Sequence, residues 1–218
     1  MEEEKIYGMT TTFKARIREI TDMQTIRVVK HRLDECCDLI RLDIQDGNSS
    51  QDIALALYEK TDEILAEARQ EDASSQAITC ARGCCHCCKQ AVVITDGEAD
   101  LLVKTALERG LTIDLAGLRR QNTCTTDEAW LDLPVEDRPC VFLGEQGECR
   151  VYDRRPLSCR KYFSVEEPAR CDIIKYPAGR VKIWHSFHAE TLATAAFTEV
   201  GGGYLPGQIL RAIERITP

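Results

Sequence analysis

The chain has 218 residues, of which 44% are hydrophobic and 29% are charged, and its formal net charge is −8. A chain of this length and composition can bury a hydrophobic core, so its folding does not depend on a metal alone. The negative charge and the lack of a Lys/Arg stripe argue against nucleic acid as the main partner, since affinity for phosphate groups depends on basic residues.

The chain opens with Met1-Glu2-Glu3-Glu4-Lys5, which is acidic where a secretory signal is basic. No apolar run reaches the length of about 18 residues that a membrane span needs. We therefore expect a soluble, cytoplasmic protein without a membrane partner. In that reducing compartment the 12 cysteines stay as thiols, so a cluster of them favours metal binding or redox chemistry over disulfides.

Residues 1–72 are predicted to form an N-terminal helical hairpin. Apolar residues recur at a helical period in its first arm (Phe13, Ile17, Ile20, Ile26, Val29, Leu33 and Cys37) and in its second (Ile53, Leu57, Ile64 and Ala68). The segment 46–49 is expected to form the turn, with Ser50 as the N-cap of the second arm. Cys36 and Cys37 are interpreted as core residues, because free cysteine behaves as a small buried hydrophobe. The hairpin also offers a surface for a protein partner.

Residues 73–176 are predicted to form the cysteine-cluster domain. A short strand is expected at 91–94, and Thr95 with Glu98 fits a capping box that starts a helix ending at Gly110. The other elements expected here are a short helix within 111–121, a second capping box at 125–128, a hairpin with arms 140–143 and 149–152, and a helix that starts at Pro156.

Residues 177–218 are predicted to pack on the same domain. The pattern indicates a hairpin with arms 173–176 and 181–184 and two helices, 190–200 and 206–216, separated by a glycine run that stops the first. The fold class expected is therefore mainly α with small β-hairpins (α+β), a metal-centred domain carrying an N-terminal helical hairpin.

Five of the nine residues from Cys80 to Cys88 are cysteine. A second block offers Cys140 and Cys149 on the expected hairpin, then Cys159 and Cys171. A structural zinc site takes four ligands, usually from two segments far apart in sequence. The two blocks supply enough thiols for two four-thiolate sites or for one larger cluster. Adjacent side chains such as those of Cys87 and Cys88 diverge on a helix or strand, which favours two metals.

Other residues near these blocks have two open interpretations. Thiolates around a metal leave excess negative charge, which nearby arginines could compensate. The same arginines could instead simply form a solvated face of the protein. The arginines close in sequence to the second block are Arg150, Arg154, Arg155 and Arg160. His86, His185 and His188 could complete a mixed site, although a lone histidine is more often an ordinary residue. Cys124 has no neighbouring cysteine and is interpreted as incidental.

The order and surroundings of the cysteines resemble a known family. The segments Gly83-Cys84-Cys85-His86-Cys87-Cys88, Pro139-Cys140-Val141-Phe142-Leu143 and Gly147 to Arg160, followed by Cys171-Asp172, closely resemble the CxxCxxCC zinc- or iron-chelating proteins, the YkgJ-like cysteine-cluster proteins. The resemblance spans about residues 80 to 172. It implies a metal site whose ligands are Cys80, Cys84, Cys87, Cys88, Cys140, Cys149, Cys159 and Cys171.

The chain departs from the family pattern in one place. Three residues separate Cys80 from Cys84 where the family name implies two, and Cys85 is an additional thiol that could substitute for Cys80. The resemblance leaves the metal open, because zinc and iron–sulfur clusters both accept four thiolates. An iron–sulfur cluster or iron is the first expectation, and zinc is the alternative.

Three functions are compatible with the sequence. The first is a metal-binding protein without catalytic turnover, which needs only the eight thiolates. The second is an iron–sulfur-dependent enzyme that modifies proteins, since flagellin lysine-N-methylases carry a similar cluster; the chain shows no G-x-G-x-x-G after a strand for S-adenosylmethionine. The third is a thiol redox sensor with Cys85 or Cys88 as an exposed thiol of low pKa.

Overall fold

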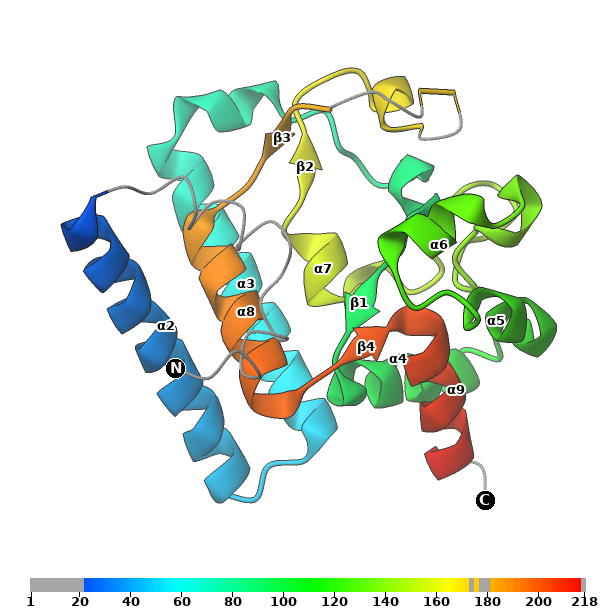
Figure 1. Cartoon of the computed structure of the whole chain (residues 1–218), viewed down its shortest axis with the longest axis horizontal. Helices are drawn as coiled ribbons and strands as arrows, with labels where there is room; N and C mark the ends of the chain where they lie inside the picture. Colours follow the sequence, from blue (N-terminus) through cyan, green and yellow to red (C-terminus); the bar gives the residue numbers. More distant parts are fainter. Residues whose placement is uncertain (1–21, 173–174, 177–180, 217–218) are drawn as a thin grey trace.

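The computed structural model describes residues 22–172, 175–176 and 181–216. This part of the chain is mainly helical with a few short antiparallel strand pairs, which confirms the expected α+β class (Figure 1). The α-helices are α2 (Met23–Gln45), α3 (Ser50–Glu71), α4 (Asp96–Glu108), α5 (Leu115–Gln121), α6 (Asp127–Asp132), α7 (Leu157–Arg160), α8 (Phe187–Val200) and α9 (Leu205–Ile216).

The remaining elements are short. The strands are β1 (Val93–Ile94), β2 (Phe163–Ser164), β3 (Ile183–Trp184) and β4 (Gly203–Tyr204). The 3-10 helices are η2 (Ala73–Ala77), η3 (His86–Lys89), η4 (Val135–Asp137), η5 (Tyr152–Arg154) and η6 (Pro168–Cys171). Most of the cysteine-bearing segments are therefore loops and single turns, which the longer helices must hold in place.

Helices α2, α3 and α8 form one side of the molecule, with α8 packed on both of the others (Figure 1). The Asp22 carboxylate accepts from the backbone N–H groups of the first turn of α2, and Ser49, not the predicted Ser50, caps α3. Two serines stand side by side there, and the Ser49 hydroxyl accepts from the Asp52 N–H at 3.2 Å. The predicted apolar positions Phe13, Ile17 and Ile20 lie outside the described residues.

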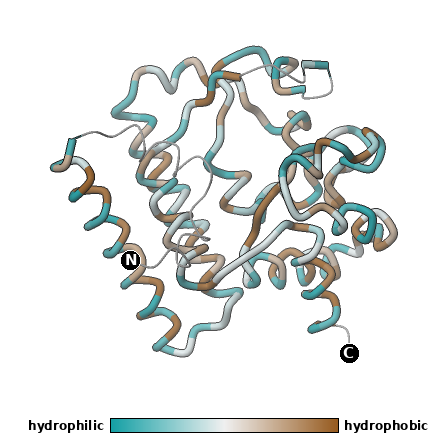
Figure 2. Tube along the Cα trace, viewed as in Figure 1, coloured by the Kyte–Doolittle hydropathy of each residue, from teal (hydrophilic) through white to brown (hydrophobic). Residues whose placement is uncertain are grey.

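The apolar faces predicted for α2 and α3 form a core with α8. Cys37 is buried in this core and Cys36 packs against it, as the sequence indicated. Along α2, residues of high and low hydropathy alternate at short intervals (Figure 2), and no helix within the described ranges is long and apolar enough to cross a membrane. The domain boundaries at 72/73 and 176/177, and the protein partner expected for the N-terminal helices, stay predictions.

Helices α4, α5 and α9 form a second core on the opposite side (Figure 1). The capping box of α4 is present with both bonds: Thr95 N–H donates to Glu98 at 2.7 Å, and Glu98 N–H donates to the Thr95 hydroxyl at 3.2 Å. Gly110 follows the helix with φ +62°, in the left-handed region where glycine is favoured. For α6, Thr126 rather than Thr125 is the N-cap.

Two-residue strand pairs join separate segments of the chain, and one of them connects its middle to its C-terminal part. The predicted strand at 91–94 exists as β1 and pairs with β4, which includes the last glycine of the 201–203 run. Gly201 ends α8 with φ +70°, as expected of a helix stop. A Cβ on Gly202 would lie 2.6 Å from the Ile94 carbonyl oxygen, so glycine permits this close approach.

The predicted hairpins differ from the observed pairings. The hairpin at 140–143 and 149–152 is reduced to one antiparallel bridge between Leu143 and Cys149. Of the C-terminal hairpin, positions 173–174 and 177–180 lie outside the described residues, and β3 pairs with β2 instead. These segments are short, so tertiary contacts rather than local propensity decide which strand pairs with which.

Candidate metal centre

The structure brings the two cysteine blocks together. The Cys140 N–H donates to the Cys88 carbonyl oxygen at 2.7 Å, and η3, which carries Cys87 and Cys88, packs against η6, which ends at Cys171. The Cys80 sulfur accepts from the Ser164 N–H of β2 at 3.0 Å. Segments about fifty or more residues apart in sequence therefore meet around the same group of thiols.

The electrostatic influence of one thiol on another divides the cysteines into two overlapping sets. Burial raises the pKa of Cys80 and of Cys84, and the negative charges of Cys87 and Cys171 raise both further. The first set is therefore Cys80, Cys84, Cys87 and Cys171.

The second set is Cys88, Cys140, Cys149 and Cys159, again with Cys87 as a neighbour. Burial raises the pKa of Cys140 to about 12 and that of Cys159 well above its usual value, and the charges of Cys149 and Cys87 add to both effects. Burial also raises the pKa of Cys149. A metal that bound these sulfurs would have to displace their protons, so binding here is coupled to proton release.

Cys87 and Cys88 interact directly although they are adjacent. Their mutual hydrogen bond is the main cause that lowers the pKa of Cys87 to about 7 and raises that of Cys88. Both residues lie in the single turn of η3, where each thiol affects the ionisation of the other. Cys87 is also the thiol whose charge acts on both sets, so it lies at their junction.

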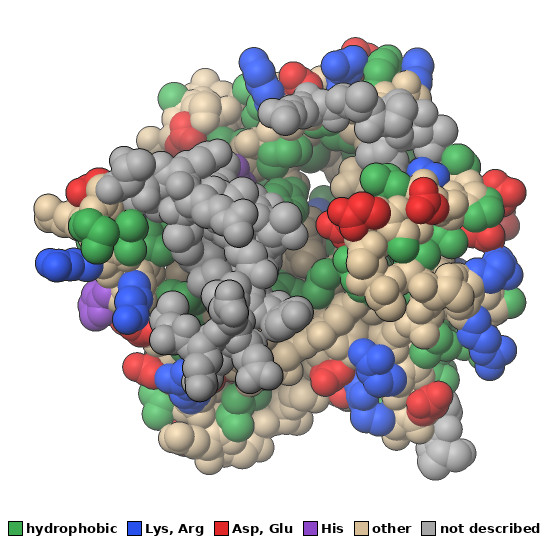
Figure 3. All heavy atoms as spheres, in the orientation of Figure 1, with side chains coloured by type: hydrophobic (Ala, Val, Ile, Leu, Met, Phe, Trp, Pro, Cys, Tyr) green, Lys and Arg blue, Asp and Glu red, His purple; other side chains and the backbone are tan. Residues whose placement is uncertain are grey.

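Thiol chemistry and mutual proximity fit a metal centre, whereas the coordination geometry is not formed. Among the residues that the structure describes, no group of three or more His, Cys, Asp or Glu side chains is arranged to hold a metal ion. The sulfurs would have to converge when a metal binds. On the face drawn in Figure 3, an opening lies near the centre, and hydrophobic and acidic side chains border different parts of its rim.

Cys159 is held in place by buried polar residues whose role sequence reasoning did not identify. Glu98 is fully buried, and besides capping α4 it accepts from the Leu157 N–H of α7 at 2.7 Å. The capping-box pattern revealed the first bond, but nothing in the sequence signals the second. A single carboxylate thus fixes the start of α4 and the start of the helix that carries Cys159.

Arg160 and Lys161 extend this support. The Arg160 side chain donates to Asp62 of α3 at 2.6 Å and to the Arg155 carbonyl oxygen at 2.9 Å. Lys161 Nζ donates to Glu190 of α8 at 2.6 Å, and both side chains are buried, at 1% and 0% exposure. The helix carrying Cys159 is therefore linked to α3, α4 and α8 together.

The four arginines singled out by sequence have different surroundings. Arg160 is the structural residue just described, and Arg150 donates to the carbonyl oxygens of Val141 and Thr112 at 2.7 and 3.3 Å. Arg154 lies 3.8 Å from the Asp153 carboxylate, where both side chains are exposed. Arg155 alone influences the candidate ligands from both blocks, since its charge lowers the pKa of Cys80, Cys87 and Cys149.

The histidines contribute less than the thiols. His86 Nδ1 lies 3.8 Å from Asp172 Oδ2, beside the junction of η3 and η6. His185 Nδ1 is 3.4 Å from the Ile183 carbonyl oxygen, and His188 is exposed on α8. Of these three histidines, His86 is therefore the one that contacts a residue next to a candidate cysteine ligand.

The cysteines outside the eight occupy separate environments. The Cys124 thiol is buried and donates to the Ala129 carbonyl oxygen at 3.3 Å, which agrees with its interpretation as incidental. Cys85 lies against the turn at Gly147, where a Cβ would meet its sulfur at 3.3 Å. Cys85 therefore packs beside Cys149's turn, near the candidate ligands.

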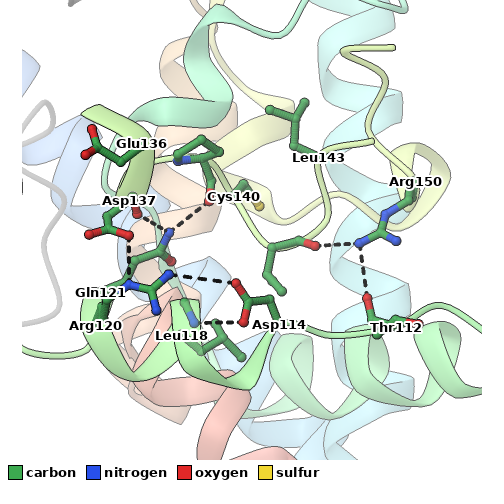
Figure 4. Close-up of a pocket in the computed structure, with 13 residues that line it drawn as sticks. Thr112, Asp114, Leu118, Arg120, Gln121, Glu136, Asp137, Cys140, Leu143 and Arg150 are labelled. Carbon is green, nitrogen blue, oxygen red and sulfur yellow. Dashed lines mark hydrogen bonds and ion pairs between the residues drawn. The ribbon is translucent and has the colours of Figure 1, made fainter. Parts of the chain in front are cut away.

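A cavity of about 280 Å³ opens beside Cys140, which is one of the residues that line it (Figure 4). Its wall combines the apolar side chains of Leu118 and Leu143 with an ionic group in which Arg120 donates to Asp137 at 2.7 Å. Gln121 closes the wall by donating to the Asp137 and Pro139 carbonyl oxygens, at 2.7 and 2.8 Å. The polar groups of the wall thus largely satisfy one another.

Comparison with protein families agrees with this site. Residues 79–175 match the family model described as "CxxCxxCC: Putative zinc- or iron-chelating domain". Neither a curated protein nor a solved structure matches the chain. The matched segment includes all eight cysteines of the two sets and the turn that carries Arg155. Over residues 79–175 this chain is therefore similar to the CxxCxxCC zinc- or iron-chelating domain family.

Proposed function

We propose that this chain is a metal-binding protein that holds iron, an iron–sulfur cluster or zinc without catalytic turnover. The observation that carries this proposal is the meeting of the two cysteine blocks, joined by the bond from Cys140 N–H to the Cys88 carbonyl oxygen. The proposed ligands are Cys80, Cys84, Cys87, Cys88, Cys140, Cys149, Cys159 and Cys171.

The two overlapping thiol sets support two adjacent four-thiolate sites, or one larger cluster, with Cys87 at the junction. A bound metal would stabilise the thiolate form of its ligands and cross-link the two blocks. The polypeptide contributes the placement: α7 presents Cys159 from a helix fixed on three sides, and η3 presents Cys87 and Cys88 against η6. The remaining adjustment is a convergence of side chains on segments that are already adjacent.

Metal identity is decided by one experiment. The full chain is purified anaerobically and analysed for iron, zinc and acid-labile sulfide, and its visible spectrum is recorded. A brown protein containing iron and sulfide would exclude zinc, and a colourless protein with stoichiometric zinc would exclude the cluster. A chain that retains neither metal under these conditions would overturn the proposal.

Cysteine variants test the ligand set. We expect Cys87→Ser and Cys159→Ser to lose metal and stability, because each removes a thiolate from the proposed centre. Cys37→Ser and Cys124→Ser are matched controls at buried cysteines outside it, and they should keep the full metal content. Metal per chain is measured beside the melting temperature, and equal metal loss in all four variants would refute this division of the cysteines.

A redox sensor is the second candidate, and the state of Cys87 favours it. Cys87 is exposed and its pKa is lowered to about 7, so part of the population would be a reactive thiolate in the absence of metal. The sequence argument named Cys85 or Cys88; for Cys88 it was wrong, because the bond from Cys87 raises the pKa of Cys88. Selective peroxide oxidation of Cys87 in the metal-loaded protein would favour this function over metal holding.

An iron–sulfur-dependent protein-modifying enzyme is the third candidate. The cavity beside Cys140 is the observation that favours it, because it places empty space next to a proposed ligand (Figure 4). Binding of S-adenosylmethionine to the metal-loaded chain, measured by calorimetry, would support an enzyme. Absence of binding leaves metal holding as the function.

A further inference from the structure

Helix α2 exposes a second set of apolar side chains, apart from the face that it packs into the core. Val28, Leu39 and Leu42 are 56%, 59% and 54% exposed, whereas Cys37 and Ile40 are buried with α8. Helix α3 is almost as long and exposes no large hydrophobic side chain. Single exposed apolar residues are ordinary, but several along one helix indicate a contact surface. Helix α2 lies at the outer edge of the molecule, where a partner can reach it (Figure 1).

These three residues belong to a regular heptad pattern. Steps of three and four residues alternate along one side of α2, as they do where a helix pairs with another helix. All six positions are exposed, and together they are called the α2 seam: Thr25, Val28, Arg32, Glu35, Leu39 and Leu42. The seam is about 26 Å long at a rise of 1.5 Å per residue. Because α2 is already folded against α8, pairing through the seam would not have to order the helix first.

The α2 seam is complementary to itself when two copies lie antiparallel. A two-fold axis between positions 33 and 34 places each seam residue opposite another one, and every such contact occurs twice. The opposed pairs are Thr25 with Leu42, Val28 with Leu39, and Arg32 with Glu35. In a parallel pairing in register, Arg32 would face Arg32 and Glu35 would face Glu35. The sequence of the seam therefore favours the antiparallel arrangement.

The other charges of α2 favour the same orientation. Residues 27–32 carry basic side chains and no acidic one, whereas residues 34–43 carry four acidic side chains and one basic side chain. That basic residue, Arg41, is already paired with Asp38 at 2.8 Å and with Glu199 at 2.7 Å. An antiparallel pair sets the basic half of each helix beside the acidic half of its copy. Glu35 lies 3.4 Å from His31 in an exposed pair, which is too weak an interaction to withhold it from a second copy.

We propose that the α2 seam is a homodimer interface, in which two copies of this chain pair antiparallel about a two-fold axis. The contact is isologous, so each residue pair is made twice. Because it has few apolar layers, the dimer should be reversible, with a dissociation constant in about the micromolar range. The seam contains no candidate metal ligand, so this inference does not depend on the proposed metal-binding function.

The first test reverses the charges of the central layer. Sedimentation velocity of the full chain measures the dimer fraction from about 1 to about 200 μM, a range around the expected dissociation constant. A thiol reductant prevents intermolecular disulfides. We expect Arg32→Glu and Glu35→Arg each to weaken the dimer at least about 10-fold, because like charges then face each other twice. An equimolar mixture of these two variants should dimerise again, since each substituted side chain meets the opposite charge on the other chain. Lys60→Glu makes the same charge change as Arg32→Glu on the exposed face of α3, and it should dimerise as the wild type does.

A second test removes an apolar layer without a change of charge. Leu39→Gln should weaken the dimer at least about 10-fold, because the leucine contributes to two contacts. Leu107→Gln is the matched control, at a leucine of α4 that is 53% exposed. Circular dichroism shows whether each variant is folded. If a charge variant does not fold, Leu39→Gln against Leu107→Gln decides alone.

Three outcomes would overturn the proposal. A wild-type chain that stays monomeric over the whole range would leave the seam to residues 1–21 of the same chain or to another protein. A dimer that persists equally in all the α2 variants would have its interface elsewhere. Failure of the Arg32→Glu and Glu35→Arg mixture to dimerise, where the wild type does, would exclude the antiparallel pairing of the seam.

Discussion

The buried ion pair between Lys161 and Glu190 gives the sharpest stability prediction, for the substitution Lys161→Met. Methionine keeps most of the lysine stem and removes the ammonium group, so the Glu190 carboxylate is left buried without this partner. At the observed 2.6 Å the attraction is about 6 kcal/mol for an effective dielectric constant of about 20, before the cost of desolvation. Loss of one partner of such a pair costs about 3–5 kcal/mol, and we expect a destabilisation in that range.

Urea unfolding followed by circular dichroism measures this effect, with Glu190→Met and the double variant completing a cycle. The double variant should recover at least half of the loss, because no uncompensated charge remains when both partners are apolar. Lys60→Met is a suitable control, since the Lys60–Glu63 pair lies on the exposed face of α3 and exposed pairs contribute about 0–1 kcal/mol. A Lys161→Met variant as stable as the wild type, or additive effects across the cycle, would refute the reasoning.

Two further predictions concern residues that hold α7. Arg160→Ala should lower the free energy of unfolding by about 2–3 kcal/mol in urea, because the charged bond to Asp62 and two bonds to carbonyl groups are lost; an effect below that of Lys60→Met would contradict it. Glu98→Gln should cost about 1–3 kcal/mol, because an amide has one oxygen for the two N–H groups of Thr95 and Leu157. Burial raises the folded-state pKa of Glu98 above its usual 4.5, so its contribution to stability is full below pH 4.5 and is lost as the pH rises through the folded pKa. Urea titrations over this pH range should show that slope in the wild type and not in Glu98→Gln.

Helix positions could largely be predicted from the sequence. Apolar periodicity identified α2, α3 and α4, and the Thr95–Glu98 capping box fixed the start of α4, because these signals act over a few residues of the same segment. Where two equivalent caps stand together, as at Ser49 and Ser50, the sequence was wrong by one residue. Local hydrogen bonding does not distinguish neighbours of the same type.

Strand pairings could not be predicted in the same way. β1 was expected as a strand, but its partner β4 lies more than a hundred residues further along the chain. The β3 segment pairs with β2, and this pairing places Phe163 opposite Trp184. Both side chains are then buried in a hydrophobic cluster with Leu65 and Ala189, which favours this partner. Two-residue strands have too little intrinsic preference to choose a partner without such packing.

For the candidate metal centre, the sequence alone determined which cysteines belong to the two blocks and that metal binding is the chemistry they favour. Only the tertiary structure decided that Cys87 lies between the two thiol sets and that Glu98 supports α7. The physical reason is that ligand type is a property of single residues, whereas charge and burial at a site depend on segments brought together from far along the chain.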